Sequence, residues 1–230
     1  MGKRQPVQQP PPVQKVRLRY AKRGPARFTS HRDFSRALER ALRRADVPMA
    51  YSSGFSPHPR ISYANASPTG AASEAEYVEL GLSAACSAEK LRLALNEVLP
   101  SGFEIVDAAD ARKESLGELL QASDWTMEIE AGDGVLERAA AALLGAERCE
   151  VERMTKNGLR TFDVRAQLVA LTVRDQRTLE VRLQHGVPLV RPDDVLTALR
   201  RLEPDVPESA LLTRIAQGPL AGDQIGDPLR

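Results

Sequence analysis

The same succession of strand-like and helix-like patterns occurs twice along this chain, and it restricts the fold more than any other feature. In the first half, apolar and basic residues alternate at 16–20, as in a half-buried strand, and apolar residues recur at helical spacing over 31–45. The expected elements are strand 16–20, helix 31–45, strands 60–64 and 76–82, helix 88–99 and strand 103–107. This βαββαβ order predicts a ferredoxin-like domain, an antiparallel sheet with two helices on one face.

The second half repeats the order with one addition. A hairpin is expected where Asn157-Gly158 favours a tight turn, and Pro192 suits the first turn of a helix. The expected elements are strand 125–131, helix 134–145, hairpin 149–164, strands 164–175 and 177–184, helix 192–202 and strand 211–217. The sequence therefore predicts an α+β protein of two tandem ferredoxin-like domains, the second with an extra hairpin.

The domain boundaries follow from changes in composition. Three consecutive prolines at 10–12 favour extended polyproline II structure, and a charged, alanine-rich stretch separates the two patterned halves. We expect a disordered Pro/Gln-rich tail at 1–14, a basic domain at 15–110, a linker at 111–122, a second domain at 123–218 and a flexible tail at 219–230.

Composition narrows the class of protein. Apolar residues are 42% and charged residues 27% of the chain, as in soluble globular domains, and no apolar run approaches the roughly 20 residues of a membrane span. The basic N-terminal residues precede no apolar segment, so no secretory signal is expected. Cys86 and Cys149 are far apart and the three histidines are scattered, so neither a metal site nor a cofactor is expected. Reduced cysteines favour a cytoplasmic location.

The net charge of +1 conceals a separation of charge along the chain. Residues 1–60 contain 14 Lys and Arg against 3 acids, a net charge of +11, whereas the rest contains 18 basic residues against 28 acids, or −10. Such a division predicts an anionic partner for the basic segment, with nucleic acid the first expectation.

The helix at 31–45 concentrates this positive charge on one face. On a helical wheel, Phe34, Leu38 and Leu42 fall opposite a row of arginines, and only Asp33 and Glu39 are nearby acids. We therefore expect an anion-binding face; the alternative is a solvated face neutralised by acids of the second half. The residues assigned to this face and its surroundings are Arg17, Arg19, Lys22, Arg23, Arg27, Arg32, Arg36, Arg40 and Arg43.

The segment YSSGFSPHPRISYA, at 51–64, follows this helix. Gly54 permits positive φ and two prolines stiffen the chain, so hydroxyls, a histidine and aromatic rings could be held ready for a phosphate or a base. The alternative is that Phe55 and Tyr63 fill the core and the prolines only shape a crossover. The candidate binding residues are Ser52, Ser53, Gly54, Phe55, His58 and Arg60.

A catalytic function would need a base with a positioned partner. Within the basic half only His31 and His58 could supply general acid–base cleavage of RNA, and His31 falls at the edge of the apolar helix face, where packing is the simpler role. His185 precedes a glycine and is expected to be a turn residue. No Ser-His-Asp order, glycine-rich phosphate loop or paired-carboxylate motif in the sequence rises above chance.

A second polar cluster surrounds the expected hairpin turn. If residues 163–165 continue as a strand, Asp163 and Arg165 lie on one face, where they form a structural ion pair or frame a ligand together with Arg191. The residues of this possible second site are Lys156, Arg160, Asp163, Arg165 and Arg191.

The run RFTSHRDFSRALERALRRADVPMAYSSGFSPHPRISYANASPTGAASEAEYVEL resembles the signature of the radical-SAM-associated proteins, a bacterial family of unknown function. The stretches DVRAQL and LVRPDDVLTAL are similar to later motifs of that family, and the resemblance covers about residues 15–215. Arg32 stands where leucine is common in the family, and Ala166 where proline is common. In longer relatives this domain follows a cobalamin-binding and radical SAM module.

The resemblance implies an accessory, non-catalytic role beside a radical SAM enzyme. The cysteine triplet that holds the cluster of such enzymes is absent from this sequence, so the partner would bind the cluster and adenosylmethionine. We expect a module that holds an anionic substrate, structured RNA above all, and presents it to that partner. One alternative is a metal-independent RNA-processing or RNA-modifying enzyme, which a fold analogy with tandem ferredoxin-like CRISPR endoribonucleases favours. The other alternative is a protein-interaction subunit.

Overall fold

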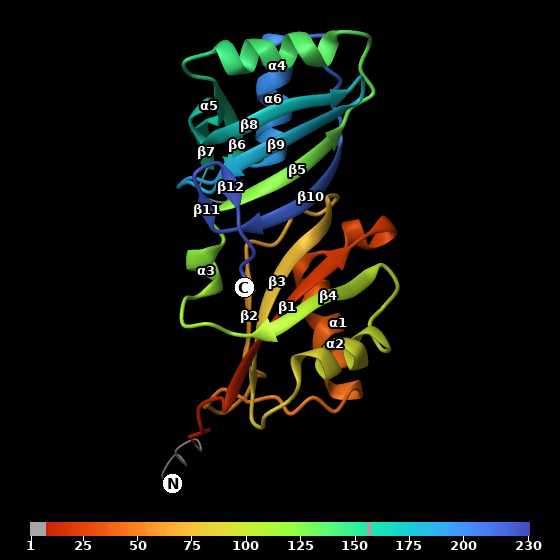
Figure 1. Cartoon of the computed structure of the whole chain (residues 1–230), viewed down its shortest axis with the longest axis vertical. Coiled ribbons are helices and arrows are strands. Elements are labelled where there is room, and N and C mark those ends of the chain that lie inside the picture. The colour runs from red at the N-terminus through yellow and green to blue at the C-terminus, as the bar shows by residue number, and fades with distance from the viewer. Residues whose placement is uncertain (1–7, 156–157) are drawn as a thin grey trace. The chain divides into compact units, whose positions relative to one another are not determined.

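The computed structural model describes residues 8–155 and 158–230 (Figure 1). The chain divides into two compact units, unit 1 ending at Leu119 but including Leu229–Arg230, and unit 2 comprising Leu120–Pro228. Each unit combines antiparallel strands with helices. The expected α+β class is therefore confirmed.

Unit 1 contains a four-stranded antiparallel arrangement in the order β4, β1, β3, β2. Its elements are β1 (Gln14–Lys22), the 3-10 helix η1 (Gly24–Phe28), α1 (His31–Arg44), β2 (Ile61–Ala64), β3 (Ala72–Leu82), α2 (Ala88–Asn96), β4 (Phe103–Asp110) and α3 (Leu116–Leu119). The succession of the first two helices and four strands is the one expected from the sequence.

The core of unit 1 follows from the alternation in β1. Val16, Leu18 and Tyr20 point to one face, where they pack with apolar residues of α1, α2, β3 and β4. Phe34 of α1 stacks on Tyr20 with 4.1 Å between ring centroids. The odd-numbered residues of β1 consequently point to the opposite face of the sheet, away from α1.

Helix α1 begins as its sequence indicates. The hydroxyl of Ser30 donates to the Asp33 carboxylate, and its oxygen accepts the Asp33 backbone N–H, which satisfies one of the free amides of the first turn. The residues buried on its inner face are Phe34, Ala37, Leu38, Ala41 and Leu42. These spacings leave a full polar face outside, which is where the arginines lie.

Unit 2 also places four antiparallel strands side by side, in the order β10, β5, β9, β8 (Figure 1). The hairpin β6–β7 forms a separate two-stranded sheet. The elements are β5 (Ala122–Glu128), α4 (Val135–Gly145), β6 (Glu150–Thr155), β7 (Gly158–Asp163), α5 (Val164–Gln167), β8 (Leu168–Asp175), β9 (Thr178–Gln184), α6 (Pro192–Leu202), β10 (Leu211–Gly218), β11 (Leu220–Ala221) and β12 (Gln224–Ile225).

The expectation that residues 164–175 form one strand is wrong at its beginning. Val164–Gln167 form the helical turn α5, and β8 starts only at Leu168. The side chain of Asp163 caps this turn by accepting the Arg165 backbone N–H at 3.1 Å. Such an aspartate cap competes with strand hydrogen bonding and turns the chain at the end of β7.

The segments expected as connectors also contain structure. Within 111–122, the short helix α3 forms, and Leu116 and Leu120 are buried. Within 219–230, β11 pairs with β12 and Leu229 is buried. The expected hairpin turn at Lys156-Asn157 lies outside the described residues. No helix in the described part of the chain is long and apolar enough to span a membrane.

Candidate anion-binding surface

The outer side of α1 carries a row of exposed arginines, Arg32, Arg36, Arg40 and Arg43, which we call the arginine face. Arg43 Nη2 lies 3.8 Å from the Glu39 carboxylate and its Nε donates to the Glu39 carbonyl at 3.2 Å, while 70% of its side chain is exposed. Within the described residues, Arg32, Arg36 and Arg40 have no ion pair. Three neighbouring guanidinium groups therefore face solvent without neutralisation.

The proline loop, defined as Tyr51–Arg60, is a closed and well-supported turn. The Ser52 N–H donates to the His58 carbonyl at 2.8 Å, and the His58 N–H donates to Ser52 Oγ at 3.0 Å. At its base the Arg60 N–H donates to the Ala50 carbonyl, at 2.8 Å, while Arg60 Nε donates to the Tyr51 carbonyl. Gly54 has a φ of +132°, as expected for a glycine-dependent turn.

The tip of the proline loop exposes aromatic surface. Phe55 is 79% exposed and Tyr51 is 40% exposed, whereas Tyr63 is partly buried against Phe34. Of the two aromatics that could have filled the core, only Tyr63 does so. Phe55 is thus positioned in solvent on a stiff loop, an arrangement suited to stacking on an unpaired base.

The arginine face and the proline loop meet at one pocket. A cavity of about 210 Å³ lies between the second half of α1 and the loop, lined on the helix by Glu39 and Arg43 and on the loop by Tyr51 and His58. The structure thus brings the helix and the loop together as expected. Glu39 adds a negative charge to an otherwise basic rim.

The arginines of β1 lie elsewhere. Arg17 is 1% exposed; its Nε donates to Glu79 at 2.9 Å, and its Nη2 contacts the backbone carbonyls of Arg112 and Glu114. Arg17 and Arg19 project from the sheet face opposite to α1, so the structure does not bring them to the arginine face. Burial alone would raise the pKa of Glu79, but hydrogen bonds from Lys15 and Arg17 outweigh it, and that pKa is lowered.

The basic residues at the end of β1 and directly after it also make contacts within unit 1. Lys22 is buried and its ammonium donates to the Pro68 carbonyl. Arg23 forms ion pairs with Glu74 and Glu104, and these hydrogen bonds, Glu74 first, raise the pKa of Arg23. Arg27 lies over the Phe28 ring with 4.6 Å to its centroid. These contacts involve Lys22, Arg23 and Arg27 in the packing of unit 1, whereas the arginines of the arginine face stay exposed.

The two candidate histidines have different surroundings. His31 makes an edge-on contact with Tyr63, with 4.7 Å between ring centroids, as a packing residue at a helix start would. His58 lines the pocket between α1 and the proline loop. His58 therefore lies beside a cavity that has a carboxylate, Glu39, on its wall.

The second cluster divides into two groups. Asp163 accepts backbone N–H groups of Cys149 and Arg165, and Arg165 belongs to α5, so the expectation that both lie on one strand face is wrong because β7 ends at Asp163. Arg160 and Arg191 instead line a cavity of about 470 Å³. The sequence did not predict a role for Arg153, which lines the same cavity. Its position two residues after Val151 places it on the inward side of an alternating strand, and this was the signal that could have identified it.

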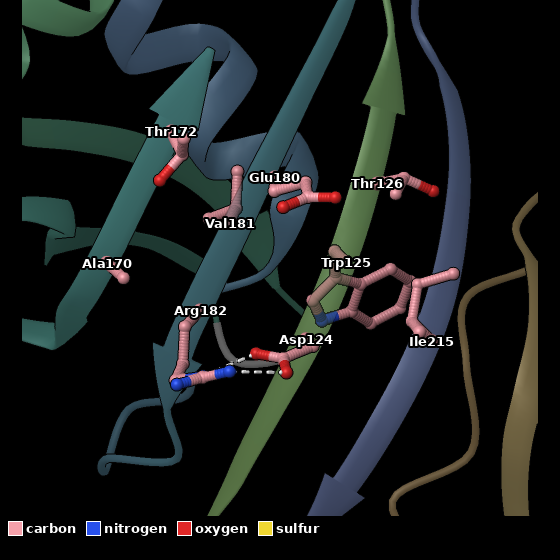
Figure 2. A pocket seen from close by; sticks show the side chains of 9 residues that line it. All are labelled: Asp124, Trp125, Thr126, Ala170, Thr172, Glu180, Val181, Arg182 and Ile215. Carbon is pink, nitrogen blue, oxygen red and sulfur yellow. Dashed lines mark hydrogen bonds and ion pairs between the residues drawn. The ribbon is translucent and has the colours of Figure 1, made fainter. Parts of the chain in front are cut away.

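Another pocket, of about 310 Å³, lies on the sheet of unit 2 (Figure 2). Arg182 forms a two-pronged ion pair with Asp124, at 2.6 and 2.8 Å, and Arg174 pairs with Glu180 at 2.6 Å. Figure 2 shows the indole of Trp125 beside Ile215. Sequence reasoning did not predict this pocket, since its polar residues read as an ordinary outer strand face.

His185 takes part in a buried hydrogen-bond chain and is more than a turn residue. Its Nδ1 lies 2.7 Å from the Leu120 carbonyl and its Nε2 lies 2.9 Å from Ser123 Oγ, which also accepts the Trp125 indole N–H. Because a carbonyl can only accept, the proton resides on Nδ1, and Nε2 accepts the Ser123 hydroxyl. Burial lowers the pKa of His185.

The described residues contain no group of three His, Cys, Asp or Glu side chains arranged to hold a metal ion. Cys86 and Cys149 are free thiols, and burial raises the pKa of Cys149.

These features define a two-unit α+β protein that presents an arginine-bearing helix beside an aromatic, proline-stiffened loop. A family model described as uncharacterized protein conserved in bacteria, DUF2344, matches residues 15–192. The chain belongs to this bacterial family. No curated protein matches it.

Proposed function

We propose that this protein is an RNA-binding module and that the arginine face and the proline loop form its binding surface. The observation that carries the proposal is a row of exposed arginines on α1 whose last member, Arg43, shares a pocket with the proline loop, which holds Phe55 in solvent. Arginine suits bidentate phosphate contacts, and aromatic rings stack on unpaired bases. An RNA with both paired and single-stranded segments satisfies both groups.

The neutralised arginines sharpen the proposal. Arg17 and Arg23 are matched to carboxylates, so the chain has acids available where charge must be compensated. Repulsion among Arg32, Arg36 and Arg40 is not offset by an ion pair in the described residues, and only Arg43 of the arginine face contacts a carboxylate. A polyanion supplies that compensation, and a purely structural helix face gains nothing from the arrangement.

The proposal includes a fold assignment. In each unit, the strand order 4-1-3-2 and the antiparallel pairing are those of a ferredoxin-like domain, with β6, β7 and α5 inserted after the first helix of unit 2. We infer two tandem ferredoxin-like domains. In this assignment α1 is the first helix of its domain, with its inner side on the sheet and its outer side open to a ligand.

The resemblance to radical-SAM-associated proteins suggests a radical SAM enzyme as the partner of this RNA-binding module. In that reading the module holds RNA for a radical SAM enzyme and has no catalytic group of its own. Affinity purification with and without ribonuclease tests this: loss of the enzyme on ribonuclease treatment indicates bridging by RNA, whereas retention indicates direct contact. Recovery of acidic proteins alone would favour the protein-interaction alternative.

The RNA-binding test compares two variants with the same change in charge. R32Q/R36Q/R40Q removes three unpaired arginines from α1, and R138Q/R174Q/R177Q removes three exposed, ion-paired arginines from unit 2. Fluorescence anisotropy with a stem-loop RNA should show at least about tenfold weaker binding for the first variant and little change for the second. Equal losses, or no binding by the wild-type protein, would refute the proposed surface.

A nuclease remains the second candidate because His58 and Glu39 line one pocket. His58→Ala should leave RNA integrity unchanged if the module only binds. Cleavage by the wild-type protein that disappears in His58→Ala, with His31→Ala active, would replace the binding proposal by the enzymatic one.

A further inference from the structure

We infer that unit 2 carries a separate pocket for a nucleoside monophosphate. The cavity of about 470 Å³ lies between the β6–β7 hairpin and the loop that precedes α6, and its volume is within the usual range for small-molecule sites. Its charged lining is Arg153, Arg160 and Arg191, and its apolar lining includes Phe162, Pro188 and Leu189.

One of the three arginines is structural. Arg153 forms an ion pair with Asp194, which is 3% exposed, and donates to the Leu189 carbonyl at 3.1 Å. Its guanidinium also lies 4.1 Å from the centroid of the Phe162 ring. Arg153 is thereby neutralised and fixed in place as part of the wall.

The other two arginines are available to a ligand. Arg160 lies directly opposite Arg153 in the β6–β7 hairpin, so the two side chains are on the same face. Two adjacent positive charges are unfavourable unless one of them is compensated. Asp194 forms its ion pair with Arg153, and its charge also acts on Arg191 without an ion pair to that guanidinium. Arg160 and Arg191 are exposed and have no ion pair within residues 8–155 and 158–230.

The loop beside these arginines is held rigid by a single side chain. Gln167 donates from Nε2 to the Pro188 carbonyl at 2.8 Å, and its Oε1 accepts the N–H groups of Gly186 and Val190. Arg191 is anchored through its own N–H to Asp194 at 2.8 Å. A preorganised loop of this kind binds without a large ordering cost.

The lining determines the chemistry of the ligand. Two free guanidinium groups suit a dianionic phosphate, and the exposed Leu189 with Pro188 offers an apolar wall on which a planar base can lie. A nucleoside monophosphate carries both groups and fits the volume. By contrast, Arg182 on the lining of the pocket in Figure 2 is already paired with Asp124, and Glu180 there is paired with Arg174 from outside the pocket.

Isothermal titration calorimetry of the full chain with AMP, adenosine and inorganic phosphate tests the inference. We expect saturable AMP binding with a submillimolar Kd, weaker binding of phosphate and no binding of adenosine. R160Q/R191Q should weaken AMP at least about tenfold, while R174Q/R177Q, at exposed sites outside the cavity, should not.

Two further variants separate the parts of the site. Leu189→Ser should weaken AMP and leave phosphate unchanged, because only the base contacts that wall. R32Q/R36Q/R40Q should leave AMP affinity unchanged, so failure of RNA binding by α1 and failure of this inference are distinguishable. A 5′-phosphorylated tetranucleotide that binds far more tightly than AMP would identify an RNA end as the source of the same phosphate chemistry.

The inference is overturned if AMP shows no saturation at about 10 mM, if phosphate binds as well as AMP, or if R160Q/R191Q binds AMP like the wild-type protein. Thermal unfolding provides a second readout. AMP should raise the Tm of the wild-type protein and of R174Q/R177Q but not that of R160Q/R191Q.

Discussion

Glu79 allows an arginine to occupy the interior of unit 1. Its carboxylate accepts hydrogen bonds from the buried Arg17 and the exposed Lys15, at 2.9 and 2.8 Å. A buried guanidinium without its carboxylate loses the charge compensation that made burial tolerable. The pair therefore explains why a β1 position with a basic residue belongs to the interior and not to a binding surface.

Glu79→Gln should lower the free energy of unfolding by about 3 kcal/mol, because the buried, charged Arg17 would lose its ion pair with the Glu79 carboxylate. Urea denaturation at neutral pH measures this. The matched change Glu89→Gln removes an exposed helix-surface pair and should have no measurable effect. Equal stability of the two variants would contradict a structural role for Glu79.

His185 gives unit 2 a dependence on pH. Its pKa is lowered below the ordinary 6.5 because burial disfavours the charged ring, so the unfolded chain binds the proton more readily. The contribution of neutral His185 to the free energy of unfolding should be fully present above about pH 6.5. It should decrease as the pH falls from there toward the folded-state pKa of His185. Protonation of Nε2 also removes the acceptor of the Ser123 hydroxyl.

Urea denaturation between pH 7.5 and about 5 measures this loss. In His185→Gln the part of the slope that arises near pH 6.5 should disappear, whereas His58→Gln, at an exposed position, should retain it. A wild-type slope preserved in His185→Gln would show that His185 does not titrate as the structure implies.

At the scale of elements, the proline loop packs closely against β3 at Gly81. A side-chain carbon at that position would come within 3.1 Å of Cβ of Arg60 and 3.0 Å of Pro12, and the Ala50 and Gly81 backbones are hydrogen bonded there. Glycine in a strand interior commonly marks such a close approach of another segment. The loop's position relative to α1 therefore depends on a residue outside both.

Gly81→Val should displace the loop and weaken RNA binding while every arginine of α1 is retained. Phe55→Ala should weaken binding to single-stranded RNA about tenfold, because a stacked base contributes roughly 1–3 kcal/mol. The Tm should not fall, because Phe55 is exposed and contacts little of the core. Leu93→Ala, at an exposed apolar residue of α2, serves as the control. Anisotropy measurements in which Phe55→Ala matches Leu93→Ala would remove the loop from the proposed surface.

The sequence pattern predicted most elements because their periodicity is local. Phe34, Leu38 and Leu42 identify the inner face of α1, and Ser30 marks its start. The partners of Arg17 and Arg23 could not be predicted, because Glu79, Glu74 and Glu104 lie more than 50 residues away in sequence. The turn at Val164–Gln167 is too short for periodicity to distinguish it from a strand.

At the scale of the whole molecule, the charge separation in the sequence is only partly expressed as surface. The first sixty residues carry a net charge of +11. Part of this charge belongs to Arg17, Lys22 and Arg23, which are buried or ion-paired within unit 1. Among the described residues of this segment, the arginines of the arginine face and Arg44 stay exposed. Net charge predicted an anionic partner, but only the structure shows which cations are available to it.

The salt dependence of RNA binding tests this account most directly. The logarithm of the binding constant should fall linearly with the logarithm of salt concentration, and the slope of R32Q/R36Q/R40Q should be smaller than that of the wild-type protein by about 2, while R138Q/R174Q/R177Q keeps the wild-type slope. Identical slopes for all three proteins, or affinity independent of salt, would contradict phosphate binding by the arginine face.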